Sequence, residues 1–158
     1  MVQKTTYIHS QILALEGDPM ILPNTAVAEI INYSDPTPVD NSPEWLLGTM
    51  EWRGIRLPLL SLEGAMGKSM PATSSNNHIA ILNSISGDDS LNFYAIVTGA
   101  LPRLINLDEK KITAAANDDS EELVLNNVLV NKTAAFIPDL NAIEDMVKGT
   151  GLKNSRIS

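Results

Sequence analysis

The chain contains 158 residues, of which 44% are hydrophobic, and carries a formal net charge of −8 at pH 7. This length predicts one domain with a sizeable core. Both halves of the chain are acidic, which argues against a nucleic-acid partner or an anionic membrane surface, because both require clustered Lys and Arg. The absence of cysteine excludes disulfides and thiolate metal sites, and it fits the reducing cytoplasm. Without a signal peptide or a run of about 20 apolar residues, we expect a cytoplasmic protein with no direct membrane insertion.

Short apolar segments bounded by Gly, Pro, Asn and Asp predict strands in the first part of the chain. The predicted strands are residues 5–15, 20–22, 46–52 and 55–60. Arg53-Gly54 joins the last two of them as a tight turn. Pro58 cannot donate a backbone hydrogen bond, so the strand over 55–60 is expected at a sheet edge.

A short helix is predicted between the second and third strands. Asn24 is suited to cap it, and Val27, Ile30 and Ile31 would then share one helical face. Residues 32–43, rich in Pro, Asp and Asn, are predicted to form a loop.

The second part of the chain follows a polar segment of small residues, 67–77, which is the best candidate for a linker. Beyond it, apolar runs predict strands over 78–85, 91–98, 101–107, 123–130 and 133–137. Residues 108–122 are charged and loop-like, with one helical turn at most. Asp139 can cap a final helix that Gly149 ends, and the residues after it are expected to be frayed.

Many short strands with few helices predict a mainly β protein, built from small barrels or a sandwich. The sequence shows no alternation of strands and helices, which argues against a parallel nucleotide-binding sheet.

No complete set of catalytic or metal-binding residues is visible. Gly67-Lys68-Ser69 resembles the end of a phosphate-binding loop, but position 62 holds Leu instead of the required glycine, and no helical pattern follows. His9 and His78 have no second ligand at metal spacing, and the acidic cluster 118–122 lacks the ligand pattern of a calcium loop. We therefore expect no cofactor and no metal ion, and a binding module rather than an enzyme.

Residues 21–67 carry a more specific pattern. The segment reads ILPNTAVAEIINY and then NSPEWLLGTMEWRGIRLPLLSLEGAMG. The order Val27-Ala28-Glu29-Ile30, Pro43, Gly48, Arg53-Gly54 and Leu57-Pro58-Leu59-Leu60 resembles the CheW-like domain of bacterial chemosensory adaptors. The second half fits this family less sharply. Tryptophan before Arg-Gly and the Trp-Leu-Leu-Gly lead-in resemble the adaptors of pilus-associated, twitching-motility systems.

The resemblance implies a single CheW-like domain over 1–158, with two packed SH3-like five-stranded barrels, a short internal helix and a C-terminal helix. The approximate subdomain division would fall near 67–77, with possible strand exchange between the halves. The resemblance also implies a non-enzymatic adaptor with two partners. These are the regulatory domain of a CheA-type histidine kinase and the cytoplasmic tip of a methyl-accepting chemoreceptor.

The resemblance also assigns partner-binding positions. Gly48 is expected to permit close approach on the kinase-facing side. We predict that Glu29 is the ion-pair mate of Arg53, whose planar fork suits a carboxylate. That pair would order the receptor-facing groove, which Ile55 and Val97 are expected to line. The full set of expected partner-binding residues is Val27, Glu29, Gly48, Arg53, Gly54, Ile55 and Val97.

The two tryptophans, Trp45 and Trp52, are expected to have different packing roles, because a spacing of seven places them on opposite faces of an ideal strand. Two other functions stay open from the sequence. One is a small β-barrel enzyme that uses Glu51, Glu63 or Asp139 as an acid. The other is a structural assembly protein without a signalling role.

Overall fold

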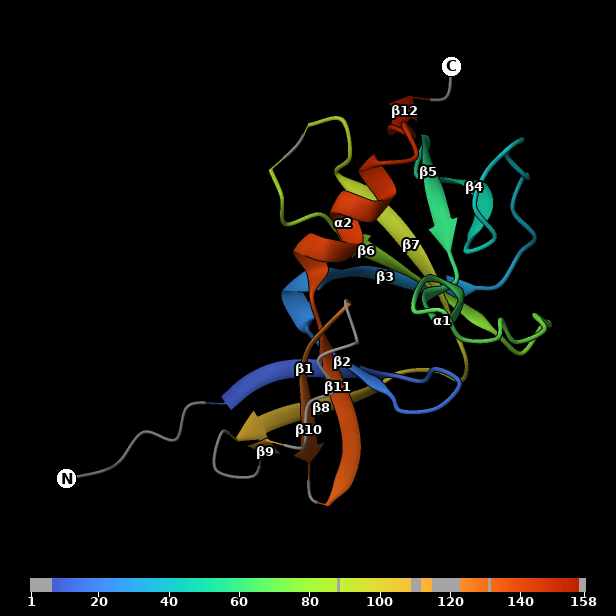
Figure 1. Cartoon of the computed structure of the whole chain (residues 1–158). Helices are drawn as coiled ribbons and strands as arrows, with labels where there is room; N and C mark the ends of the chain where they lie inside the picture. The colour runs from blue at the N-terminus through green and yellow to red at the C-terminus, as the bar shows by residue number, and fades with distance from the viewer. Residues whose placement is uncertain (1–6, 88, 109–111, 115–122, 131, 157–158) are drawn as a thin grey trace.

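The computed structural model describes residues 7–87, 89–108, 112–114, 123–130 and 132–156. Strands dominate these residues, so the predicted mainly β class is confirmed (Figure 1). In the first part of the chain the elements are β1 (Tyr7–Leu13), β2 (Met20–Pro23), the 3-10 helix η1 (Asn24–Ala26), β3 (Val27–Asn32), β4 (Leu46–Trp52), β5 (Ile55–Leu60) and α1 (Leu62–Ala65). The later elements are β6 (His78–Asn83), β7 (Phe93–Thr98), β8 (Arg103–Asp108), β9 (Ile112–Ala114), β10 (Val124–Val130), β11 (Thr133–Pro138), α2 (Leu140–Lys148) and β12 (Ser155–Arg156).

The strands form two sheets that correspond to two SH3-like barrels. Barrel 1 contains β3 to β7 together with β12, and its strand order is β12-β5-β7-β6-β3, with β4 also paired to β5. Barrel 2 has the order β8-β1-β2-β11-β10-β9. In the described part of the chain each sheet has six strands instead of the predicted five, because the short strands β9 and β12 add to them.

The chain changes sheet at three places, none of them at 67–77: before β3, after β7, and between β11 and β12. Strands β1 and β2 lie in barrel 2, beside strands from the second half of the chain, and η1 leads from them into barrel 1. The return to barrel 2 occurs over residues 99–102, between β7 and β8. The predicted division near 67–77 is wrong in this respect, because β5 and β6 on either side of it belong to one sheet.

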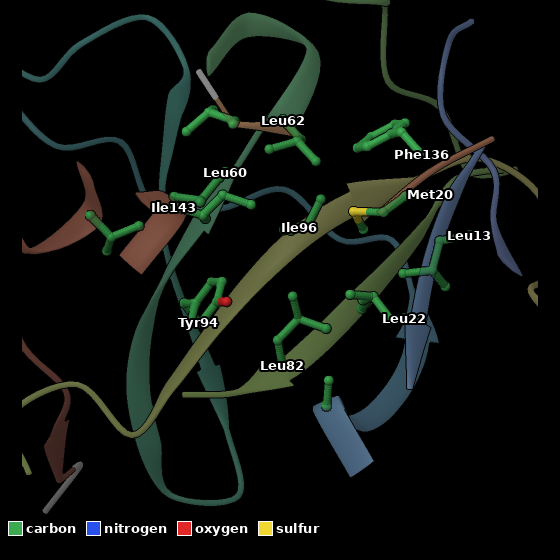
Figure 2. Packing of buried hydrophobic residues seen from close by; sticks show 14 of the residues in the cluster. Leu13, Met20, Leu22, Leu60, Leu62, Leu82, Tyr94, Ile96, Phe136 and Ile143 are labelled. Atoms are coloured by element: carbon green, nitrogen blue, oxygen red, sulfur yellow. The ribbon is translucent and has the colours of Figure 1, made fainter. Parts of the chain in front are cut away.

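A large hydrophobic cluster lies where the two barrels meet (Figure 2). Leu13 and Met20 enter it from barrel 2, Leu60 and Ile96 enter it from barrel 1, and Ile143 enters it from α2. All five side chains are fully buried. Full burial of such a side chain stabilises the fold by about 1.5–3 kcal/mol. This cluster therefore holds the barrels and α2 together, while separate clusters fill each barrel.

Helix α2 forms as the sequence predicts. The Asp139 side chain accepts a hydrogen bond from the backbone N–H of Ala142 at 3.1 Å, which satisfies one of the free donors at the helix start. The helix ends at Lys148, before Gly149. Among the described residues, no helix has the length and apolar character needed to cross a bilayer.

The predicted helix over residues 24–31 is wrong. Only the single turn of η1 forms, and Val27 begins strand β3. The reason lies in where the apolar side chains pack. Val27 and Ile30 pack against the cluster between the barrels, whereas Ile31 packs inside barrel 1. This division between two cores fits an extended β-branched segment buried on both faces better than a one-faced helix.

Strand β5 lies inside its sheet, so the prediction of an edge strand is wrong for the strand as a whole, but one side of β5 is unpaired at Pro58 itself. Strand β4 pairs with β5 along its whole length, and Pro58 lies opposite Thr49. Both backbone groups of Thr49 bond to Thr37 at 2.8 Å, so Thr49 and Pro58 are a non-hydrogen-bonded pair and the Pro58 nitrogen faces away from β4. On that side β5 pairs with β12 only at residues 55–56 and with β7 only at 59–60. The missing donor therefore falls in a gap.

Two further expectations concern segments that were predicted to lack regular secondary structure. Residues after α2 are predicted to be frayed, but Ser155–Arg156 pair with β5 as β12. The predicted loop over 108–122 contains β9 at Ile112–Ala114, and most of the rest, including the acidic cluster 118–122, lies outside the described residues.

Candidate functional site

The candidate site is built on the tip of the β4–β5 hairpin. Trp52 pairs with Ile55, so the turn contains only Arg53 and Gly54. Both residues have positive φ, 47° and 76°. This conformation matches the right-handed twist of the flanking strands, and it normally favours Asn or Gly at the first position. An arginine there carries strain on the order of 1 kcal/mol, which surrounding contacts must offset.

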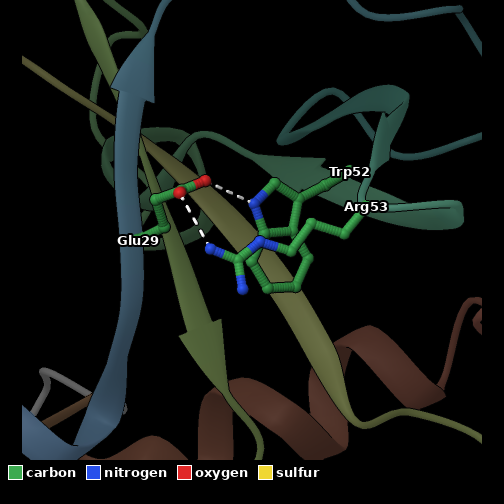
Figure 3. A network of polar contacts seen from close by, with 3 residues as sticks. All are labelled: Glu29, Trp52 and Arg53. Atoms are coloured by element: carbon green, nitrogen blue, oxygen red, sulfur yellow. Dashed lines mark hydrogen bonds and ion pairs between the residues drawn. The ribbon is translucent and has the colours of Figure 1, made fainter.

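Those contacts converge on the carboxylate of Glu29 in β3 (Figure 3). The Trp52 indole Nε1–H donates to Glu29 Oε2 at 2.7 Å, and Arg53 Nη2 donates to Glu29 Oε1 at 3.1 Å. The Arg53 guanidinium also lies over the Trp52 ring, with its Cζ 4.8 Å from the ring centroid. The predicted ion pair between Glu29 and Arg53 is therefore confirmed.

The sequence did not predict that Trp52 would donate a hydrogen bond in this network. Trp52 is expected to be a packing residue, and it is indeed buried in the cluster inside barrel 1, with 8% of its surface exposed. The additional role is the donation of its indole N–H to Glu29. One signal was available: a two-residue turn places the tryptophan directly beside Arg53, and buried indole N–H groups seek a partner.

The other tryptophan has a different environment. Trp45 packs against the cluster between the barrels, whereas Trp52 belongs to the cluster inside barrel 1. The two tryptophans thus have the separate packing roles that their spacing predicts. Trp52 also contacts Phe93 of β7 edge to face, with ring centroids 5.0 Å apart and an interplanar angle of 62°.

The network joins the two ends of the barrel 1 sheet. Strand β3 pairs only with β6 in the described part of that sheet, and β4 lies at its opposite end. Glu29 in β3 reaches Trp52 and Arg53 at the end of β4. The register of β3 shifts between Val27 and Glu29, which marks a bulge just before the carboxylate. Bulges commonly redirect a side chain in this way.

Electrostatics keep the network charged at neutral pH. The hydrogen bond from Trp52, followed by that from Arg53, lowers the pKa of Glu29 below its usual value of 4.5. Because the folded-state pKa is depressed, the contribution of Glu29 to stability is present above pH 4.5 and is lost as the pH falls through the folded-state value.

Gly48 has a neighbour from its own chain. A Cβ at this position would overlap the carbonyl oxygen of Thr37 and approach the side chain of Pro36 to 3.1 Å. Thr37 forms two backbone hydrogen bonds to Thr49, so the loop over 32–43 crosses directly above Gly48. In this structure, the segment that lies close to Gly48 is this loop of the same chain.

The remaining predicted site residues are dispersed. Val27 begins β3 and is partly buried against the cluster between the barrels. Ile55 lies beside the hairpin tip, whereas Val97 is 6% exposed and lines a cavity of about 390 Å³ near the end of β7. Because Leu59 is level with Ala95, Ile55 and Val97 are separated by about six residues, or about 20 Å along the strands. Ile55 and Val97 therefore do not lie side by side, and a groove lined by both would run about 20 Å along the sheet.

The three carboxylates considered for acid catalysis lie on different elements. Glu51 forms an exposed ion pair with Arg56 at 3.7 Å. Glu63 accepts a backbone hydrogen bond from Glu16, and Asp139 caps α2. Each therefore has a structural contact of its own. In the part of the chain that the structure describes, no three His, Asp or Glu side chains gather in a group that could hold a metal ion.

Comparison with known families identifies the fold. The CheW-like domain matches residues 11–147, which is most of the chain. The chain belongs to the CheW-like domain family. Among solved structures, this CheW-like domain is similar to the crystal structure of the scaffolding protein TtCheW from Thermoanaerobacter tengcongensis, with a TM-score of 0.71 and 18% sequence identity. The alignment covers 85% of this chain and 86% of that one. A search of curated proteins found no match.

This membership agrees with the resemblance seen in residues 21–67, and the solved structure supports the two-barrel fold. The CheW-like family is a family of chemotaxis scaffolds and adaptors. For this CheW-like domain, the Glu29–Trp52–Arg53 network is therefore a candidate for protein binding rather than for catalysis.

Proposed function

We propose that the chain is a non-enzymatic cytoplasmic adaptor that couples a CheA-type histidine kinase to a methyl-accepting chemoreceptor. Its membership of the CheW-like family is the observation that supports this function most strongly. Trp52 before Arg53-Gly54 and the Trp-Leu-Leu-Gly lead-in favour a pilus-associated, twitching-motility pathway over a flagellar one.

The hairpin tip is the proposed determinant of receptor binding. Arg53 is 66% exposed at its side chain and Glu29 is 36% exposed, so partner residues can reach both. The contacts with Glu29 and Trp52 hold Arg53 in an unfavourable backbone conformation, and strain of this kind often persists at functional sites. The network then fixes the position of the Glu29 side chain on β3.

We propose an indirect role for Gly48 in kinase binding. Its lack of a side chain lets the loop over 32–43 lie flat against β4, and this loop forms part of the outer surface. Gly48→Asp would displace the backbone of Thr37, so its effect on binding could not be separated from its effect on folding. Arg53→Ala is the better probe of the site, because the Arg53 side chain is exposed.

The test measures binding of the purified chain to the regulatory domain of a CheA-type kinase and, separately, to a receptor tip fragment. We expect wild type to bind both, and Arg53→Ala to weaken receptor binding about tenfold or more while the melting temperature stays within a few degrees. Arg103→Ala removes an exposed arginine from β8 in barrel 2 and is the matched control.

Failure of the wild-type chain to bind the kinase domain would refute the adaptor function. Self-association without binding to either partner would instead favour the structural assembly protein. Equal receptor binding by Arg53→Ala and Arg103→Ala would refute the site assignment while leaving the adaptor function in place.

A further inference from the structure

Residues 152–156, which follow α2, occupy an unusual place in barrel 1. Strand β4 pairs along one side of β5, so β7 and β12 must both use the other side. The parallel pairing of β5 with β7 is confined to Leu59–Leu60, and β12 pairs with β5 further towards its start, at Ile55 and Arg56. The segment therefore lies where the first halves of β5 and β7 have separated.

Asn154 fills the β7 side of this gap. Its Oδ1 accepts hydrogen bonds from the backbone N–H groups of Asn92 at 2.7 Å and Phe93 at 2.9 Å. Its Nδ2 donates to the carbonyl oxygen of Phe93 at 2.9 Å, and its backbone N–H donates to Ser90. The side-chain amide thus satisfies both backbone groups of Phe93, as a neighbouring strand would.

Phe93 connects this segment to the candidate site. Its ring packs edge to face against Trp52. Trp52 in turn donates to Glu29 and lies under Arg53. Asn154 therefore contacts Phe93, and Phe93 contacts the Trp52 ring. The segment that was expected to be frayed is hydrogen-bonded to the backbone of Phe93, the residue that packs against Trp52.

The segment also changes the charge of the hairpin tip. Arg156 is level with Ile55, which directly follows the Arg53-Gly54 turn. Arg53 pairs with Glu29 and Arg56 pairs with Glu51, whereas the exposed Arg156 belongs to neither of these two ion pairs. Arg156 therefore adds one exposed positive charge beside a tip where Arg53 and Arg56 lie near Glu29, Glu51 and Asp35. An exposed arginine of this kind can pair with a carboxylate on an acidic segment of a partner.

We propose that residues 152–156 are part of the receptor-binding surface: Asn154 positions Phe93 and, through it, the Trp52–Arg53–Glu29 network, and Arg156 extends that network towards an acidic segment of the partner. This inference rests on the proposed function for its partner, but the positioning role can be measured on the free protein. Asn154 is a positioning residue and Arg156 is a contact residue.

The first experiment compares the two indole N–H signals in the ¹H–¹⁵N spectrum, with Trp52 assigned through Trp45→Phe. We expect Asn154→Ala to move the Trp52 signal towards that of a free indole and to speed amide exchange at Phe93. Asn154→Asp keeps an acceptor for the N–H groups of Asn92 and Phe93 but places a carboxylate oxygen against the Phe93 carbonyl, so we expect the Trp52 signal to move in this variant as well. Asn126→Ala, at an exposed position on β10, is the control.

The second experiment measures receptor binding of the same variants. If Asn154→Ala reduces the binding-competent fraction to about a tenth, the Kd rises about tenfold. We expect Arg156→Gln to leave the Trp52 signal unchanged and to weaken binding about two- to fivefold at low salt, with the difference vanishing at high salt.

An unchanged Trp52 signal in Asn154→Ala would overturn the positioning role. A shifted signal with unchanged receptor binding would overturn the assignment of the segment to the binding surface. If wild type binds no receptor fragment, the proposed partner fails, and the positioning role is then decided by the indole signal alone.

Discussion

Glu144 of α2 offers the sharpest test of how the helix is held on barrel 1. Its side chain is fully buried, and its two carboxylate oxygens accept hydrogen bonds from four groups. These are the Ser84 hydroxyl at 2.6 Å, the backbone N–H groups of Ile85 and Ser86 at 3.0 Å and 2.9 Å, and the Tyr94 hydroxyl at 3.2 Å. Glu144→Ala would leave all four donors without this acceptor.

The expected cost follows from these contacts. Removing one side of a buried, hydrogen-bonded charged site costs about 3–5 kcal/mol. Ser84 to Ser86 lie in the loop after β6, where Ile85 is 51% exposed, so water can replace part of what their donors lose. The lower end, about 3 kcal/mol, is therefore expected. For a domain of this size that corresponds to a fall in melting temperature of about 6–12 °C.

Equilibrium denaturation of three variants tests this reasoning. Glu144→Gln keeps one accepting oxygen and should fall between Glu144→Ala and wild type. Asp145→Ala alters the neighbouring exposed carboxylate and should change stability by less than about 0.5 kcal/mol. The result that would refute this reasoning is a small difference between the two alanine variants. If the free energies of unfolding of Glu144→Ala and Asp145→Ala differ by less than about 1 kcal/mol, the Glu144 carboxylate does not hold the loop and the helix together as described.

Three further predictions concern stability. Gly48→Ala should destabilise the fold by about 1–3 kcal/mol in denaturant titrations, because the new Cβ overlaps the Thr37 carbonyl; a neutral result would mean that the loop moves freely. Burial next to Glu144 raises the pKa of Tyr94 above its usual 10.0, so stability should be retained below pH 10 and fall above it, and Tyr94→Phe should remove that fall. Asp139→Ala should cost about 1 kcal/mol through loss of the helix cap, whereas Asp139→Asn should cost little.

The hairpin tip was predictable from sequence because its determinants are local. A glycine after a single polar residue between two apolar runs specifies a two-residue turn. The family pattern marks Glu29 and Arg53 as site positions, their pairing is predicted from the fit of a guanidinium to a carboxylate, and the structure confirms the pair. The additional hydrogen bond from Trp52 depends on the bulge in β3, for which the sequence carries no local signal.

The errors share a physical cause, which is that they depend on pairing between distant segments. Val27, Ile30 and Ile31 have the spacing of a helical face, but two cores on opposite sides of β3 require an extended chain. The role of residues 152–156 depends on where β5 and β7 separate, about 100 and 60 residues earlier in the chain, respectively. Neither fact can be seen in a short window of sequence.

At Arg53, the residue that would best suit the backbone conformation differs from the residue that the proposed binding site uses. Arg53→Asn would place a residue that favours this backbone conformation at the first position of the turn, so the hairpin itself should form at least as readily. The same change would remove the guanidinium from Glu29 and from the Trp52 ring. Selection for stability alone would therefore not retain arginine here. An adaptor that had lost its receptor could drift towards Asn-Gly at this turn and keep its fold.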